Sequence, residues 1–158
     1  MKPNWKLIGK RLKAKLNSKR GYEILDKCAG GTWTAGGCFY LSTVLSKMLP
    51  GEMVSLWGKC KINENFGGYC KKIAQHSTFE VEPNCYLDGD GFSTTEQLVA
   101  RWEKEEQIGD IDLLPANENL DAFDILVTYE AIETLKSFLE PVFKEYLKQL
   151  IIEDSFKV

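Results

Sequence analysis

The sequence AGGTWTAGGCFYLSTVLSKML, residues 29–49, joins a glycine-rich loop to an apolar helix. Glycine adopts backbone conformations closed to other residues, so the loop is either a tight connection or a segment that brings backbone amides close to a ligand. A helical stripe follows, formed by Leu41, Val44, Leu45 and Met48. Pro50-Gly51 ends it. We therefore expect a helix over 38–49, with Cys38 as its first residue.

The N-terminal segment is also predicted to be helical. Over residues 4–18, apolar side chains recur at helical spacing and lysines fill the opposite face. Gly21 interrupts this pattern, and Tyr22–Cys28 predicts one or two further helical turns. Residues 2–20 are rich in Lys and Arg and contain no acid, which indicates either a solvated helix surface or a contact for an acidic partner.

Short apolar runs in the middle of the chain predict a small antiparallel sheet. The expected strands are Met53–Trp57, Ile73–Val81 and a third that starts at Tyr86-Leu87-Asp88. Pro83-Asn84 is the expected turn between the last two strands, and residues 63–69 predict a loop. The sequence Asp88-Gly89-Asp90-Gly91 must turn, because two glycines and two aspartates disfavour a continuing strand.

The C-terminal part is expected to return to helix. Ser93 and Glu96 have the spacing of a capping box. The helix after them would present Leu98, Val99 and Trp102 as its apolar face. Ile108–Asn119 predicts a polar, proline-containing connection. A helical pattern then runs from Leu120 to Ile152, with a break or kink expected at Pro141 near Glu140. This last segment would cover the core or offer a helix to a partner.

Together these elements predict an α+β fold. A helical N-terminal part would pack the Cys38 helix on the small antiparallel sheet, and a helical tail would follow. The length of 158 residues suits a single domain over 1–158, with its core at about 22–105 and its C-terminal helices at about 120–153.

Composition argues against several classes of partner. Hydrophobic content is 44%, charged content is 27% and net charge is −3, which gives no general attraction to nucleic acid. No apolar run approaches the roughly 18 residues of a membrane span, and Met1-Lys2-Pro3 leads into a charged segment instead of a signal core. Five cysteines form an odd, irregularly spaced set, which favours reduced thiols and a cytoplasmic location.

Cys38 is the candidate nucleophile. A catalytic thiol must lose its proton, and the unpaired amides and dipole of a helix N-terminus favour the resulting negative charge. The same amides would hold the oxyanion that forms on an attacked carbonyl. Gly36 and Gly37 would let a substrate approach without a side-chain clash, and Trp33 would form one wall of a substrate cleft.

His76 is the only histidine and therefore the candidate base, with Asp88 or Asp90 as the acceptor that orients its ring. A strict two-residue turn at Pro83-Asn84 would point both aspartates to the sheet face opposite His76. An odd loop or a bulge would shift the register by one. His76 would then face Asp90, with Asp88 one pair away on the same face. A triad therefore requires an odd connection or a bulge.

Three segments taken together, Trp33–Cys38, Gln75–Val81 and Tyr86–Gly91, resemble the papain-like superfamily. The likeness is closest to its transglutaminase-like and arylamine acetyltransferase-like branches, and it covers roughly residues 30–102. Those enzymes place cysteine at a helix start, histidine on one strand and aspartate on the next.

The resemblance implies Cys38 as nucleophile, His76 as base and Asp88 as the orienting acid, with Asp90 as the fallback. The chain lacks the tryptophan that follows the cysteine in papain proteases. It is also shorter than the acetyltransferases, which argues against a coenzyme A site. No cofactor is expected.

Other uses of Cys, His and Asp are disfavoured. The thiols and histidine between Cys60 and Cys85 contain no Cys-x-x-Cys pair, which structural zinc sites usually show. A calcium loop counted from Asp88 would have Val99 at its twelfth position in place of glutamate, which excludes an EF-hand. No metal is expected.

The sequence thus predicts a thiol-dependent hydrolase or acyl transferase that acts on an amide of a protein or peptide. Protease, deamidase and transglutaminase-like reactions share an acyl-thioester on the nucleophile, here Cys38. The alternative is a non-enzymatic protein-binding inhibitor or adaptor, including one built on an inactivated cysteine-enzyme scaffold. Neither nucleic acid nor a membrane is expected as a partner.

Overall fold

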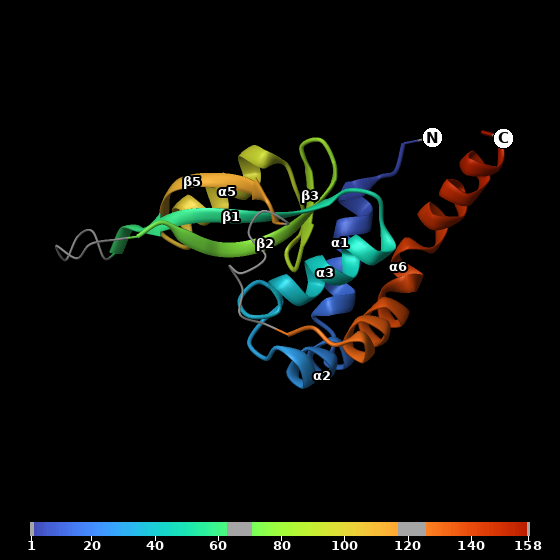
Figure 1. Ribbon diagram of the computed structural model, residues 1–158, viewed down its shortest axis with the longest axis horizontal. Helices are drawn as coiled ribbons and strands as arrows, with labels where there is room; N and C mark the ends of the chain where they lie inside the picture. The colour runs from blue at the N-terminus through green and yellow to red at the C-terminus, as the bar shows by residue number, and fades with distance from the viewer. Residues whose placement is uncertain (1, 63–70, 117–125, 158) are drawn as a thin grey trace.

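The computed structural model describes residues 2–62, 71–116 and 126–157. Helices and antiparallel strands are both present in this part of the chain, so the predicted α+β class is confirmed (Figure 1). The helices are α1 (Trp5–Leu16), α2 (Lys19–Cys28), α3 (Cys38–Met48), α5 (Thr95–Lys104) and α6 (Tyr129–Ser155). The strands are β1 (Glu52–Cys60), β2 (Ile73–Glu82), β3 (Cys85–Asp88), β4 (Gly91–Ser93) and β5 (Ile108–Pro115).

The strands form one sheet in the order β4-β3-β2-β1-β5, and each neighbouring pair is antiparallel. The prediction of a polar connection at Ile108–Asn119 is wrong over the described residues, because 108–115 forms edge strand β5. Side chains alternate there, with Asp110, Asp112 and Leu114 exposed. Pro115 is tolerated because it lies at the end of an edge strand.

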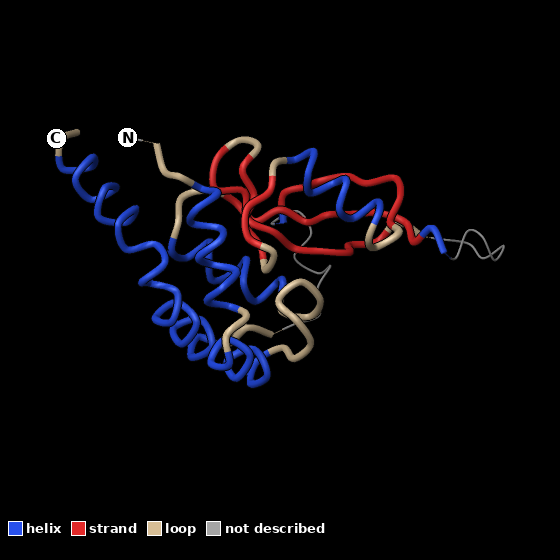
Figure 2. Tube along the Cα trace, turned by 180° about the vertical axis from the view of Figure 1, so that it is seen from behind, coloured by secondary structure: helices blue, strands red, loops and turns tan. Residues whose placement is uncertain are grey.

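Helices cover both faces of the sheet. On one face, α3 packs on β2 while α1, α2 and α6 surround it (Figures 1 and 2). Buried side chains here include Leu12 of α1 and Leu139 of α6, so the core extends beyond the predicted 22–105 on both sides. On the other face, α5 buries Leu98 and Trp102 against β1, β3 and β5.

Two helix starts differ from the prediction. Gly21 does not interrupt a helix: α2 begins at Lys19, and the Ser18 hydroxyl caps it by accepting from the Gly21 N–H. A Cβ at Gly21 would lie 2.0 Å from the Leu16 carbonyl oxygen, so the close approach of α1 and α2 requires glycine. The capping box of α5 is formed by Thr94 and Gln97, one residue later than the Ser93 and Glu96 predicted.

The long C-terminal helix runs through Pro141 without ending, so the predicted break does not occur. Proline removes one backbone hydrogen bond and costs about 3 kcal/mol in a helix interior. Leu135, Leu139 and Phe143 are buried on both sides of it. Each contributes roughly 1.5 to 3 kcal/mol by burial, so packing outweighs the cost of the proline. None of the helices in the described ranges is long and apolar enough to cross a membrane.

Two predictions fall on other residues. The loop at 63–69 and the predicted start of the last helix at 120–125 lie outside the described ranges. Within those ranges, α6 begins at Tyr129, where the Thr128 hydroxyl accepts from the Ala131 N–H.

Candidate thiol active site

Cys38 is the first residue of α3, as predicted. The helices α1, α2, α5 and α6 carry a side-chain cap at their N-termini, whereas Gly37 caps α3 without a side-chain hydrogen bond. The N–H groups of a first helical turn have no intrahelical acceptor. The amides and the positive dipole end at the start of α3 are therefore not occupied by a capping side chain and can stabilise negative charge on the Cys38 sulfur.

The glycine loop before α3 is a tight connection. Gly36 has φ +102, and a Cβ there would lie 2.9 Å from the Gly30 carbonyl oxygen. A Cβ on Gly37 would lie 2.5 Å from the Leu25 side chain. Both glycines are therefore required by the path of the chain, and the substrate-binding role predicted for them stays a prediction.

Trp33 lies in the core and not on an open cleft wall, which corrects the role expected for it. Its side chain is 1% exposed, and its indole N–H donates to the Leu16 carbonyl at 2.8 Å. The ring stacks against Tyr40, with 5.9 Å between centroids. Gly89 packs so closely on Trp33 that a Cβ would lie 2.7 Å from the Trp33 Cβ. Trp33 thus supports the turn that follows Asp88.

A bulge in β2 sets the register that a triad requires. Glu82 pairs with Cys85 across the predicted Pro83-Asn84 turn, and an irregularity between Glu80 and Glu82 then shifts the pairing by one residue. Phe79 consequently pairs with Leu87. Continuing this register places the residue after Leu87 on the same sheet face as His76.

His76 and Asp88 meet inside the protein. His76 is 0% exposed and Asp88 is 3% exposed. The His76 Nε2 lies 2.9 Å from the Asp88 Oδ2, which is hydrogen-bond distance. The structure thus selects Asp88 over the fallback Asp90 as the aspartate that touches the ring.

Asp88 does not engage the other nitrogen of the His76 ring. Among the residues that the structure describes, the buried His76 Nδ1 makes no hydrogen bond of ordinary geometry. The Cys38 thiol is nevertheless close enough to the ring for each group to shift the pKa of the other. Catalytic hydrogen bonds are often long or poorly aligned before a substrate binds.

Backbone amides also act on the sulfur. β3 pairs with β2 only from Phe79 onward, so the first turn of α3 lies against the open edge of β2 at Ser77. The backbone N–H groups of Ser77 and Phe39 lie near enough to the Cys38 sulfur to lower the pKa of the thiol. A hydrogen bond between the Ser42 and Ser77 hydroxyl groups, whose oxygens lie 2.5 Å apart, also holds α3 against β2.

The pKa values within the site favour charge separation. Burial raises the pKa of Cys38, but the close contact and charge of His76 and the two amides bring it below the ordinary value. For His76 the direction is opposite: burial lowers its pKa. The hydrogen bond to Asp88, the contact with Cys38 and the charges of both groups outweigh burial and raise the pKa of His76 to about 9. These directions favour a thiolate–imidazolium pair over a neutral thiol and imidazole.

Asp88 remains ionised although it is buried. Burial raises its pKa, but the hydrogen bond and charge of His76, the charge of Arg101 and the Asp90 N–H lower it below the ordinary value. Arg101 Nη2 donates to Asp88 Oδ2 at 2.6 Å, and the Asp90 N–H donates to Asp88 Oδ1 at 2.9 Å. The Asp90 carboxylate pairs with Arg101 at 3.3 Å and with Lys13 at 3.7 Å. Asp90 therefore belongs to the outer part of the network.

Sequence reasoning did not assign Arg101 and Trp102 to the site. Both residues lie on α5 and contact the candidate site. Arg101 binds Asp88, and the Trp102 ring stacks on His76 with 4.7 Å between ring centroids. The sequence pattern favours Trp102 as an apolar helix residue. The sequence offers one signal for their role in the site: Arg101 stands next to Trp102 on the helix that follows the Asp88 turn.

Comparisons with protein-family models, with curated proteins and with solved structures found no match.

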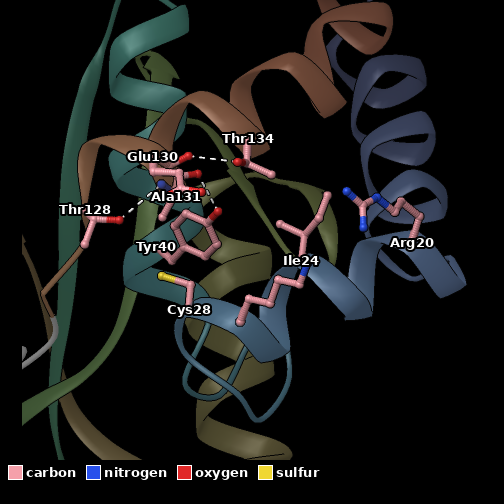
Figure 3. Close-up of a pocket in the computed structure, with 9 residues that line it drawn as sticks. Arg20, Ile24, Cys28, Tyr40, Thr128, Glu130, Ala131 and Thr134 are labelled. Carbon is pink, nitrogen blue, oxygen red and sulfur yellow. Dashed lines mark hydrogen bonds between the residues drawn. The ribbon is translucent and has the colours of Figure 1, made fainter.

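The described residues contain no group of three or more His, Cys, Asp or Glu side chains placed to hold a metal ion. A cavity of about 300 Å³ is lined by residues of α2 and of the start of α6, with Tyr40 of α3 in its wall (Figure 3). The Tyr40 hydroxyl donates to the Ala131 carbonyl at 2.6 Å. Cys38 does not line this cavity, and the Cys38 side chain is 6% exposed. A substrate larger than a small reagent would reach the sulfur only after a local movement.

Proposed function

We propose that this chain is a thiol-dependent hydrolase or acyl transferase of papain-like, transglutaminase-like type, acting on an amide of a protein or peptide. The observation that carries the proposal is the buried His76–Asp88 contact of 2.9 Å. It occupies one ring nitrogen and leaves the other for the thiol at the start of α3. The proposal includes a cytoplasmic location, which rests on the odd and irregularly spaced set of five cysteines in the sequence.

In the proposed reaction the Cys38 thiolate attacks the amide carbon, and the carbonyl oxygen becomes an oxyanion beside the amides of the first turn of α3. The His76 imidazolium gives its proton to the leaving amine as the C–N bond breaks. An acyl-thioester on Cys38 remains. Water or a second amine then attacks, His76 takes its proton, and the thiolate leaves. Asp88 holds the ring orientation and stabilises the imidazolium throughout.

An activated acyl donor tests this chemistry without knowledge of the natural substrate. p-Nitrophenyl acetate should acetylate Cys38 with a burst of nitrophenolate, and hydroxylamine should then accept the acetyl group. Mass spectrometry of the digested protein locates the adduct. The Cys38→Ala and His76→Ala variants should lose the burst, and Cys85→Ala should retain it. Acetylation spread evenly over the cysteines would remove the support for a catalytic thiol.

A second candidate is a protein-binding inhibitor or adaptor on an inactivated scaffold of the same type. The 6% exposure of Cys38 favours it, because an active nucleophile must meet its substrate. The Cys38→Ser variant separates the two proposals once a biological activity is in hand. Activity that survives the change in a folded protein supports binding, whereas activity that disappears supports chemistry.

A further inference from the structure

Three lysines of α1 line a groove on the outside of the molecule, beside the hairpin of β3 and β4. The groove has a volume of about 330 Å³, and its walls are Lys6, Lys10, Lys13, Asp90, Phe92 and Gln97. α1 packs tightly at this place: a Cβ on Gly9 would lie 2.5 Å from the backbone nitrogen of Phe92. The wall that carries the lysines is therefore held firmly against the hairpin.

The positive charge of this groove is poorly neutralised. Lys6 and Lys10 form none of the ion pairs found in the described part of the chain, and the first turn of α1 has no acid. Lys13 meets only Asp90, at 3.7 Å, with the two side chains 55% and 38% exposed. Such exposed pairs are weak and exchange readily for another carboxylate. Asp90 would keep its second partner, Arg101.

We infer that this groove is a docking site for an acidic, extended protein segment. Lys6, Lys10 and Lys13 lie four and three residues apart on one face of α1, which spaces them by roughly 6 Å and 4.5 Å along the axis. Alternate side chains of an extended peptide point the same way at about 6.8 Å, so acids at alternate positions can each meet a lysine. The half-buried Phe92 supplies an apolar surface for the peptide backbone and methylene groups. The net charge of −3 opposes long-range attraction of any anionic ligand, and it opposes a nucleic acid most strongly, because every phosphate carries a charge.

The inference does not depend on the proposed acyl chemistry, because the groove contains neither Cys38 nor His76. It does share a network with the candidate site. Asp90 lines the groove, and its backbone N–H donates to Asp88 at 2.9 Å. A bound acidic segment would therefore contact Asp90, whose backbone N–H donates directly to Asp88 of the candidate triad.

Fluorescence anisotropy with a labelled Glu-Ser-Glu-Ser-Glu peptide tests the inference on the whole protein. Binding should saturate, should weaken as salt is added, and should be absent for the Gln-Ser-Gln-Ser-Gln peptide. The double variant Lys6→Glu, Lys10→Glu should weaken binding about tenfold or more. The matched control, Lys144→Glu with Lys148→Glu on the exposed side of α6, changes net charge equally and should bind as the wild type does.

Circular dichroism checks that each variant is folded, and Cys38→Ala should bind the peptide unchanged whether or not the acyl chemistry holds. Three outcomes would overturn the inference. These are no saturable binding of the acidic peptide, equal losses in the α1 and α6 variants, and tighter binding of a single-stranded oligothymidylate than of the peptide. The last would assign the groove to nucleic acid instead.

Discussion

Replacing Asp88 with Asn keeps the shape of the side chain and removes the charge that faces His76. The pKa of His76 is raised from 6.5 to about 9, which corresponds to about 3 kcal/mol in favour of the imidazolium. Burial alone lowers this pKa, and the bond to Asp88 is the largest influence that raises it. In Asp88→Asn, His76 should therefore be neutral at pH 7, and Cys38 should lose the cation that stabilises its thiolate.

The rate of Cys38 alkylation by iodoacetamide at pH 7 reports this loss. A change of about 3 kcal/mol corresponds to a fall of up to about 100-fold. Peptide mass spectrometry gives the alkylation rates of Cys38 and Cys85 in the same sample. Cys85 serves as the internal reference, because burial raises the pKa of its thiol. Asp90→Asn is the matched control, because Asp90 contacts Arg101 and Lys13 and not His76.

The Asp90→Asn variant should change the rate less than about threefold, which is under 1 kcal/mol. The reasoning is refuted if a folded Asp88→Asn protein is alkylated at the wild-type rate, or if both variants lose reactivity equally.

Three further outcomes are expected. Gly36→Ala should lower the free energy of unfolding by about 1 to 3 kcal/mol, because φ is +102 and the new Cβ would press on Gly30. Urea denaturation measures this loss, and an unchanged midpoint would mean that the loop relaxes freely. Leu139→Ala should cost about 2 to 5 kcal/mol, since this α6 side chain is fully buried, and a loss below about 1 kcal/mol would show that α6 is not part of the core. The folded-state pKa of Asp88 is lowered, so its contribution to stability is complete above the ordinary value of 3.8 and is lost as pH falls through the folded value. Urea denaturation between pH 5 and pH 2 should therefore show a steeper loss of stability for the wild type than for Asp88→Asn, and parallel curves would speak against an ionised Asp88.

The sequence predicted the elements that depend on local pattern. Glycine before an apolar helix located the start of α3, and Pro83-Asn84 located the β2–β3 turn. Whether the two aspartates share a sheet face with His76 depended on a bulge, and nothing in the sequence of Glu80–Glu82 predicts that bulge. Long-range packing sets that register, because α3 and Trp33 hold the two strands and the turn after Asp88 in place.

Other features were missed because a local signal competed with a tertiary one. Pro115 and two aspartates made β5 resemble a loop, yet pairing with β1 outweighed their low strand propensity. Gly21 suggested an interruption, but close packing of α1 on α2 requires glycine there. The contact between Arg101 and Asp88 spans thirteen positions and joins a helix to a strand, so helical spacing alone could not reveal it.

The pKa of the Cys38 thiol, measured from the pH dependence of its alkylation, tests the central claim most directly. The wild type should give a pKa below the ordinary value of 9.0. In His76→Ala, burial should then dominate and raise the pKa above 9.0. A wild-type pKa at or above 9.0, unchanged in His76→Ala, would contradict the account.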